Sequence, residues 1–281
     1  MPNKTPSSSA RRKTAKTRRP HPIHRLLAIM ARLRDPVKGC PWDLEQDHKS
    51  LKVYLMEEAS EVLDAIDSRV DHKLQDELGD LLLQIVFHAQ MASERGAFQF
   101  SDVADSISAK LVRRHPHIFG DRQVKDSAEV VRNWEEIKKS EKGRQSVFDG
   151  VPRNLPALLR AFRLQEKASV VGFDWKAAHE VAGKVREEIE EFLEVSREND
   201  RTKMEEEYGD ILFSLVNLGR FLGLNAEFSL EAANRKFMER FAEIEENARQ
   251  RGIKLESMTL EEMDAIWEEA KGRGQGLGVR G

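Results

Sequence analysis

Residues 57–61 read EEASE and residues 77–80 read ELGD, and the chain repeats both motifs as EEIEE at 187–191 and EYGD at 207–210. Corresponding positions are offset by 130 residues. Positions three or four apart share one face of a helix, so each pair predicts two neighbouring helices with carboxylates between them. Such carboxylates repel one another unless a cation lies among them, and hard oxygen ligands of this kind suit Mg²⁺ or Mn²⁺.

The context of the acids favours a metal site over the simpler interpretation, a solvated helix face in a chain that is 34% charged. Asp80 and Asp210 each open an apolar run, LLLQIVF at 81–87 and ILFSLV at 211–216. A charge beside a buried seam is costly without a partner. Glycine also precedes both aspartates, although it costs roughly 1 kcal/mol relative to alanine inside a helix.

The predicted metal ligands are therefore one set of four acids per repeat. In the second repeat they are Glu188, Glu191, Glu207 and Asp210, and in the first, as a weaker candidate site, Glu58, Glu61, Glu77 and Asp80. Glu57 and Glu187 are placed to reach a second ion or to orient a ligand. Four carboxylates carry a charge of −4, which two divalent cations would neutralise.

Apolar periodicity is helical almost throughout and predicts an all-α fold. The expected helices are 24–34, 51–68, 72–94, 101–114, 127–142, 155–169, 176–198, 201–222, 229–251 and 260–271. A GxxW motif precedes each acidic region, at 39–42 and 172–175, and a WEExK motif closes each half, at 134–138 and 267–271. We therefore expect two homologous helical units, 21–142 and 151–272, with a linker over 143–156, a disordered basic tail over 1–20 and a flexible Gly-rich end over 273–281.

Bulk properties exclude several functional classes. The net charge of −3 gives no strong field for nucleic acid, apart from the basic tail, and no apolar stretch approaches the roughly 20 residues of a membrane span. The tail has no apolar region of the kind a secretory signal needs. The single Cys40 excludes an intrachain disulfide and fits a reducing compartment, so we expect a cytoplasmic protein.

Basic residues favour a polyphosphate ligand at the second acidic set. Lys184 and Lys203 each lie four residues before an acid of the set, and Lys236 and Arg240 lie one turn apart on a later helix. The first half has Tyr54 and Met56 where the second has Lys184 and Arg186. The alternative is that Lys184 and Lys203 make ordinary ion pairs with Glu188 and Glu207, and that Trp267 packs in a core rather than stacking on a base.

Together these motifs resemble the MazG family of nucleoside triphosphate pyrophosphohydrolases in its two-repeat form. The resemblance rests on GCPWD at 39–43, RRHPHIFGD at 113–121, NWEEIK at 133–138, VGFDW at 171–175 and the acidic motifs. It implies a four-helix arrangement in each unit, commonly an interlocked homodimer, and Mg²⁺-dependent cleavage of a nucleoside triphosphate to a monophosphate and pyrophosphate. It also implies that the second repeat is the active one.

The resemblance assigns the same four metal ligands in the second repeat. The nucleotide contacts it implies are Lys184, Arg186, Lys203, Glu206, Lys236, Arg240, Trp267 and Lys138. Catalysis is expected at Glu187, Glu188 and Glu191, with Glu187 taking the proton of the attacking water. No residue near the acids clearly reads a base edge, so broad base tolerance is expected. The alternative is a non-catalytic helical binding module with structural Mg²⁺ sites.

Overall fold

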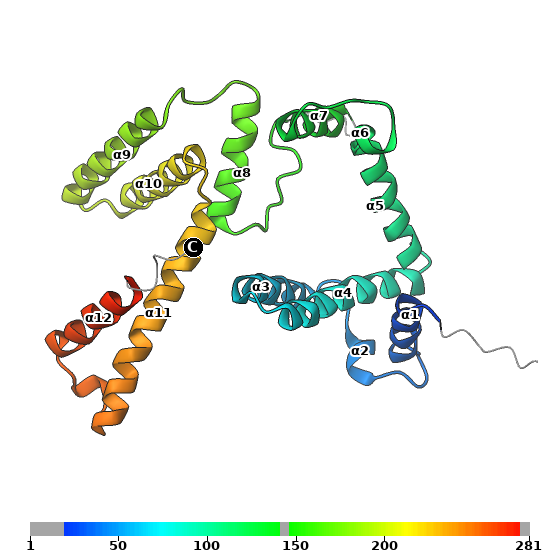
Figure 1. Ribbon diagram of the computed structural model, residues 1–281, viewed down its shortest axis with the longest axis horizontal. Helices are drawn as coiled ribbons and strands as arrows, with labels where there is room; N and C mark the ends of the chain where they lie inside the picture. Colours follow the sequence, from blue (N-terminus) through cyan, green and yellow to red (C-terminus); the bar gives the residue numbers. More distant parts are fainter. Residues whose placement is uncertain (1–19, 141–145, 276–281) are drawn as a thin grey trace, which may run out of the picture. The chain divides into compact units, whose positions relative to one another are not determined.

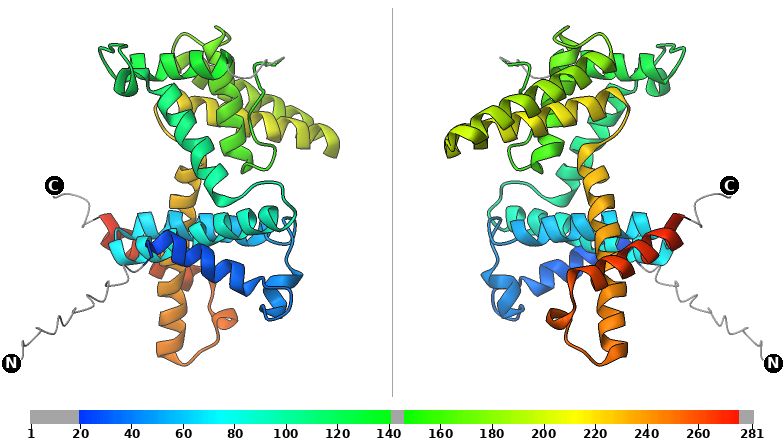
Figure 2. Two further views of the ribbon diagram at one scale, coloured as in Figure 1. Left: turned by 90° about the vertical axis from the view of Figure 1, so that its right-hand side faces the viewer. Right: turned by 90° about the vertical axis from the view of Figure 1, so that its left-hand side faces the viewer.

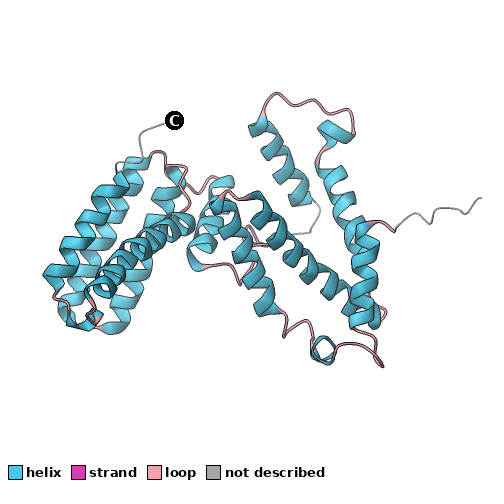
Figure 3. Ribbon diagram, turned by 60° about the horizontal axis from the view of Figure 1, so that its bottom comes forward, coloured by secondary structure: helices cyan, strands magenta, loops and turns pink. Residues whose placement is uncertain are grey.

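The computed structural model describes residues 20–140 and 146–275, and every regular element within these ranges is a helix (Figure 3). This confirms the all-α prediction. The chain divides into two compact units, Met1–Glu141 and Lys142–Gly281. The expected basic tail falls on residues 1–20 and most of the expected Gly-rich end on 276–281, so both lie largely outside the described residues.

The two units have the elements labelled in Figure 1. Unit 1 contains α1 (Pro22–Leu33), α2 (Pro41–Glu45), α3 (Lys52–Ser68), α4 (Asp71–Glu94), α5 (Phe100–Arg114), α6 (Pro116–Phe119) and α7 (Ser127–Ser140). Unit 2 contains α8 (Ala157–Val170), α9 (Ala178–Glu198), α10 (Arg201–Phe221), α11 (Ala226–Arg251), η1 (Leu255–Ser257) and α12 (Leu260–Gln275). The short elements α2, α6 and η1 were not predicted, because five residues or fewer give no helical period to recognise. Helix α12 continues four residues past its predicted end.

Each acidic pair of helices is folded back by a tight turn. Helix α3 ends at Arg69 and α9 ends at Asn199, and both residues adopt left-handed backbone angles, with φ of 55° and 53°. A left-handed residue is a common way to end a helix. In unit 2 the side chain of Asp200 then accepts hydrogen bonds from the backbone N–H groups of Thr202 and Lys203, which caps α10. The short turns make α3 antiparallel to α4 and α9 antiparallel to α10.

The core of unit 1 fills the space between α1, α3 and α4. Met30, Leu51, Val86, Phe87 and Met91 form its buried cluster, and Tyr54 packs against it. Arg34 follows α1 with a side chain only 9% exposed. Its guanidinium donates to Glu94 Oε1 at 2.8 Å and to the backbone oxygens of the α2 region. This one cation therefore ties the end of α1 to α2 and to the end of α4.

Unit 2 has two parts. Helix α10 packs against α9 and α8, and the beginning of α11 contacts α8 and α10. Helix α11 then runs on and pairs with α12, as Figures 1 and 2 show. This hairpin has a small core of its own, Ile244, Ala248 and Met258, with Trp267 packed against it. None of the helices in the described ranges is long and apolar enough to cross a membrane.

We predict that Glu94→Gln destabilises the protein at neutral pH by about 2 kcal/mol, as expected for a hydrogen bond to a charged group. Hydrogen bonding to Arg34 lowers the pKa of Glu94. The stabilisation is therefore complete above the carboxyl pKa of the unfolded chain and is lost as the pH falls through the lowered folded value. Urea unfolding of the full chain at pH 7 and at a pH below that folded value measures the effect.

The exposed Glu45 provides the control, because Glu45→Gln should be neutral at both pH values. If Glu94→Gln lowers the free energy of unfolding equally at both pH values, the ion pair between Arg34 and Glu94 does not provide the stabilisation.

Candidate functional site

The acids of the second repeat converge between α9 and α10. Glu188, Glu207 and Asp210 each offer a carboxylate oxygen, and these oxygens all lie within 4.8 Å of one another. Glu188 is 7% exposed, whereas Asp210 is exposed. The fourth predicted ligand, Glu191, is exposed and is not part of this group, although it interacts with Glu188. Three of the four predicted ligands therefore form a compact oxygen cluster.

The first repeat builds the same cluster from Glu58, Glu77 and Asp80, again within 4.8 Å, with Glu61 outside it. Burial raises the pKa of Glu58, and the charges of Asp80 and Glu61 raise it further. Burial is likewise the main cause that raises the pKa of Glu77. The shifts show carboxylates that crowd one another, which a divalent cation would relieve. The donor set, three hard oxygens per cluster, fits Mg²⁺ or Mn²⁺.

Lys184 joins the second cluster from α9. Its Nζ lies 2.7 Å from Glu187 Oε1 and 2.9 Å from Glu188 Oε1. The hydrogen bonds that Lys184 donates to these two carboxylates raise its pKa, so the lysine is fully charged. At Glu191, burial raises the pKa, and the nearby Lys184 charge partly offsets this effect. The ion pair between Lys184 and Glu188, which was the alternative to a phosphate contact, is thus formed, and it places a cation beside the acids.

Lys203 does not make the ion pair that its spacing suggested. Its Nζ lies 3.2 Å from Glu198 and 3.9 Å from Asp200, not beside Glu207. The reason is the tight turn, which brings the end of α9 and the cap of α10 next to the first turn of α10. Lys203 is exposed and therefore remains able to exchange these surface partners.

A cavity of about 760 Å³ opens beside the second cluster. Lys184, Glu188 and Asp210 belong to its wall, together with apolar side chains from α8, the α8–α9 loop and α10. Trp175 and Phe213 are two of its aromatic lining residues, and they are 44% and 45% exposed. The cavity thus joins a charged region to an aromatic one.

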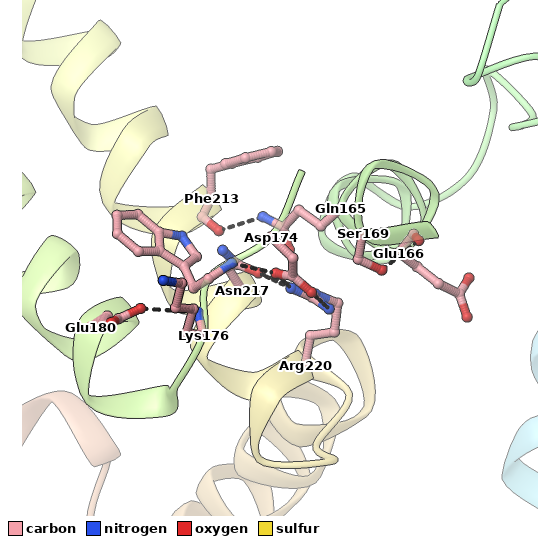
Figure 4. Close-up of polar contacts among 10 residues, drawn as sticks. Gln165, Glu166, Ser169, Asp174, Lys176, Glu180, Phe213, Asn217 and Arg220 are labelled. Carbon is pink, nitrogen blue, oxygen red and sulfur yellow. Dashed lines mark hydrogen bonds and ion pairs between the residues drawn. The ribbon is translucent and has the colours of Figure 1, made fainter. Parts of the chain in front are cut away.

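A polar network crosses the wall of this cavity, as Figure 4 shows. Arg220 on α10 donates to both carboxylate oxygens of Asp174 in the α8–α9 loop, one of them at 3.0 Å. Its Nε and one terminal nitrogen also donate to Asn217 Oδ1, at 3.1 and 2.9 Å. Gln165 on α8 donates through Nε2 to the backbone oxygen of Phe213 at 2.8 Å. These bonds hold the loop and α8 against α10.

Sequence reasoning missed this network, although a signal for it was present. Asp210, Phe213, Asn217 and Arg220 follow one another at helical spacing, so they share a face of α10. Asn217 also interrupts a run that is apolar in the first repeat, where Phe87 occupies its position.

In the first repeat the corresponding space is filled by side chains. Phe87 is 3% exposed and belongs to the core with Leu51 and Met30. Tyr54 stands where Lys184 stands, packs against the same core and makes an edge contact with Trp42, at 5.7 Å between ring centroids. The two repeats therefore share their acids but not their surroundings.

The other predicted contact residues are not among those that line the cavity. Lys236 is exposed on α11, and the Arg240 guanidinium lies 5.3 Å above the Trp267 ring. Trp267 also contacts Phe237, at 5.2 Å, so it packs within the α11–α12 hairpin. Arg186, Glu187 and Glu206 are exposed on α9 and α10, and Lys138 belongs to α7 of unit 1.

Comparison with known proteins identifies the family. The model of the MazG nucleotide pyrophosphohydrolase domain matches residues 46–119 and again residues 178–248. The chain belongs to the MazG family. Both matched stretches contain one acidic cluster, which confirms the resemblance seen in the motifs.

Two relatives match this chain over most of their own length, and a third matches about half of it. The Escherichia coli K12 protein named nucleoside triphosphate pyrophosphohydrolase is 48% identical over 254 residues, which cover 89% of this chain and 97% of that protein. The Thermotoga maritima protein named nucleoside triphosphate pyrophosphohydrolase/pyrophosphatase MazG is 48% identical over 249 residues, or 88% and 94% of the two chains. A Mycobacterium tuberculosis nucleoside triphosphate pyrophosphohydrolase is 40% identical over 148 residues, 52% of this chain and 44% of that protein.

We predict that Asp210→Asn weakens Mn²⁺ binding at the second cluster at least about tenfold, because a neutral amide replaces an anionic ligand. Removal of one charge also relieves repulsion, so the metal-free variant should unfold at the same temperature as the parent or higher. Calorimetric titration with Mn²⁺ and thermal unfolding measure the two effects.

The matched variant Asp80→Asn removes the same ligand from the first cluster and should leave the tighter Mn²⁺ site intact. The assignment is wrong if Asp80→Asn abolishes that site and Asp210→Asn does not.

Proposed function

We propose that the protein is a Mg²⁺-dependent nucleoside triphosphate pyrophosphohydrolase, with Mn²⁺ as a possible substitute, whose second repeat carries the reaction. The substrate would be a ribo- or deoxyribonucleoside triphosphate with broad tolerance for the base, and the products a monophosphate and pyrophosphate. The observation that carries this proposal is the cavity that Lys184 and two acids of the second cluster share with an aromatic wall. Membership of the MazG family and the names of its relatives support it.

Glu188, Glu191, Glu207 and Asp210 would hold the divalent cations. When bound, such cations neutralise phosphate charge and lower the pKa of a coordinated water. The chain itself supplies the remaining positive charge. Lys184 is already charged beside the acids, and phosphate oxygens would replace Glu187 as its partner. Lys203, Lys236, Arg240 and Arg186 are further candidates for phosphate contacts.

Release of Glu187 from Lys184 would free a carboxylate at the edge of the cluster. We assign Glu187 as the group that takes the proton from the attacking water. The water oxygen forms a bond to the α-phosphorus, the bond from that phosphorus to the bridging oxygen breaks, and pyrophosphate leaves. Little beyond positioning and charge stabilisation is required of the protein in such a transfer. Glu206, Lys138 and Trp267 stay proposed nucleotide contacts.

A homodimer is part of the proposal. Ile189 and Leu193 on α9 are 41% and 50% exposed, and Leu215 on α10 is 44% exposed. Within the described residues α9 packs mainly against α10. A second copy that covered these apolar side chains would complete a helical bundle with two-fold symmetry. We place the enzyme in the cytoplasm, where it would remove unwanted nucleotides or adjust their level under stress.

The alternative of a non-catalytic module applies best to the first repeat. There Tyr54 and Phe87 occupy the positions of Lys184 and Asn217 and fill the space beside the acids. The acids of that repeat would then bind a cation without turning over a nucleotide.

We predict that Glu191→Gln lowers kcat of pyrophosphate release about 100-fold or more, since it removes a predicted ligand close to the reacting phosphate. Glu61→Gln, the same change in the first repeat, should keep activity within about twofold, because nothing beside that cluster is equipped for a triphosphate. Turnover of a nucleoside triphosphate mixture with Mg²⁺ gives both values, and circular dichroism checks the fold. Normal turnover by Glu191→Gln, or a larger loss in Glu61→Gln, would overturn the assignment.

The dimer gives a separate prediction. Leu193→Arg should shift the full chain from dimer to monomer in light scattering, because a charge on a buried apolar patch is costly. Val37→Arg, at a residue 84% exposed in unit 1, is the control and should leave the mass unchanged. A parent protein that is already monomeric contradicts the dimer.

A further inference from the structure

We infer that the cavity between α8, α9 and α10 binds the nucleobase of the substrate, and that the Asn217 side-chain amide recognises the base. The inference rests on the proposed function, because it takes the phosphates to lie at the second acidic cluster. It assigns the base to a site on unit 2 separate from Trp267, which packs in the α11–α12 hairpin.

The spacing along α10 fits a nucleotide that runs from phosphate to base. Asp210 and Asn217 are seven residues apart and face the same cavity. Seven residues of helix span about 10 Å. If the triphosphate binds at Asp210, the ribose would span the distance along α10 and the base would lie beside Asn217. Phe213 lies between the two, on the same face.

The aromatic part of the wall suits a flat base. Trp175 and Phe213 are almost half exposed where they line the cavity. In the described part of the chain Trp175 has no aromatic partner, whereas Trp42 of the first repeat contacts Tyr54. Bases stack on aromatic side chains irrespective of their identity. An uncovered indole beside a phosphate-binding cluster is thus placed to stack on a base.

The orientation of the Asn217 amide is fixed by its neighbours. Its Oδ1 accepts two hydrogen bonds from Arg220, and a guanidinium can only donate. Arg220 is in turn held by Asp174, and Figure 4 shows the three side chains in one group. The Nδ2 amino group is the part of Asn217 left for a ligand, and it makes no hydrogen bond within residues 20–140 and 146–275. Asn217 therefore offers a donor to a base carbonyl or ring nitrogen.

A second polar group of the wall lacks a partner. Gln165 is 7% exposed, and its Nε2 donates to a backbone oxygen, which identifies the other atom as Oε1. That buried Oε1 has no hydrogen-bond partner among the described residues. A buried acceptor without a donor is costly, and a base amino group or ring N–H could supply the donor. The wall thus presents both a donor and an acceptor, as base recognition requires.

The first repeat keeps a tryptophan, Trp42, where Trp175 stands, but it lacks the polar pair on the corresponding helix, α4. Phe87 and Gln90 stand where Asn217 and Arg220 stand, and Phe87 is buried in the core. The base site would therefore exist in the second repeat alone.

The test compares Asn217→Asp with the parent. The carboxylate keeps the bond to Arg220 but replaces the amino donor with an acceptor. KM for ATP, CTP, GTP and UTP should rise about tenfold, the size of one lost hydrogen bond, with kcat within about twofold. The relative kcat/KM values of the four nucleotides should also change. Inorganic triphosphate, which has no base, should inhibit both proteins with the same Ki.

Two further variants sharpen the test. Asn217→Leu should raise KM in the same way, and Asn234→Asp, at an exposed residue of α11, should change nothing. The inference is overturned if KM is unaffected by either Asn217 variant, or if the Ki of inorganic triphosphate rises in step with KM.

The proposed function has its own contradicting result, which is that the parent protein releases no pyrophosphate from any nucleotide. In that case calorimetric binding of a non-hydrolysable α,β-methylene nucleotide with Mn²⁺ still tests the base site. The parent should then bind at least about tenfold more tightly than Asn217→Asp, and equal affinities would overturn the inference.

Discussion

Mutual repulsion of carboxylates between two antiparallel helices is the constraint on which the rest of the structure depends. Each acidic cluster holds three carboxylate oxygens within 4.8 Å. The two-residue turns at Arg69–Val70 and Asn199–Asp200 force the helices together, and the apolar runs that follow Asp80 and Asp210 hold them there. Apolar packing thus holds the carboxylates close together against their mutual repulsion. A divalent cation bound between them would turn that repulsion into attraction.

The same scaffold gives two different environments because a few side chains beside the acids differ. In unit 1, Tyr54 and Phe87 join the core, and Arg34 ties the helix ends together around it. In unit 2, Lys184 turns to the carboxylates, and Asn217 and Arg220 line a cavity instead of filling it. The cost of that opening is exposed aromatic surface at Trp175 and Phe213, which a ligand would cover.

Periodicity and motif spacing were enough to predict the ten long helices and the acidic clusters, because both depend on local geometry. The spacing of Lys184 and Glu188 offered their ion pair only as the alternative to a phosphate contact, and that pair is present. Spacing failed for Lys203, whose partners come from across a turn, and it could not place Asp174 against Arg220, which are 46 residues apart in sequence. The cavity was also beyond prediction, since it depends on what three helices and a loop leave unfilled. The sequence feature that comes closest to indicating the cavity is the polar Asn217 at the position where the first repeat has Phe87.

The central claim is that the second acidic cluster, with the cavity beside it, holds cation and nucleotide together. Anomalous diffraction from crystals grown with Mn²⁺ and an α,β-methylene nucleotide tests it most directly. We expect an anomalous peak among Glu188, Glu207 and Asp210, in contact with the phosphates, and a base beside Trp175. Mn²⁺ confined to Glu58, Glu77 and Asp80, or a nucleotide bound away from the second cluster, would contradict it.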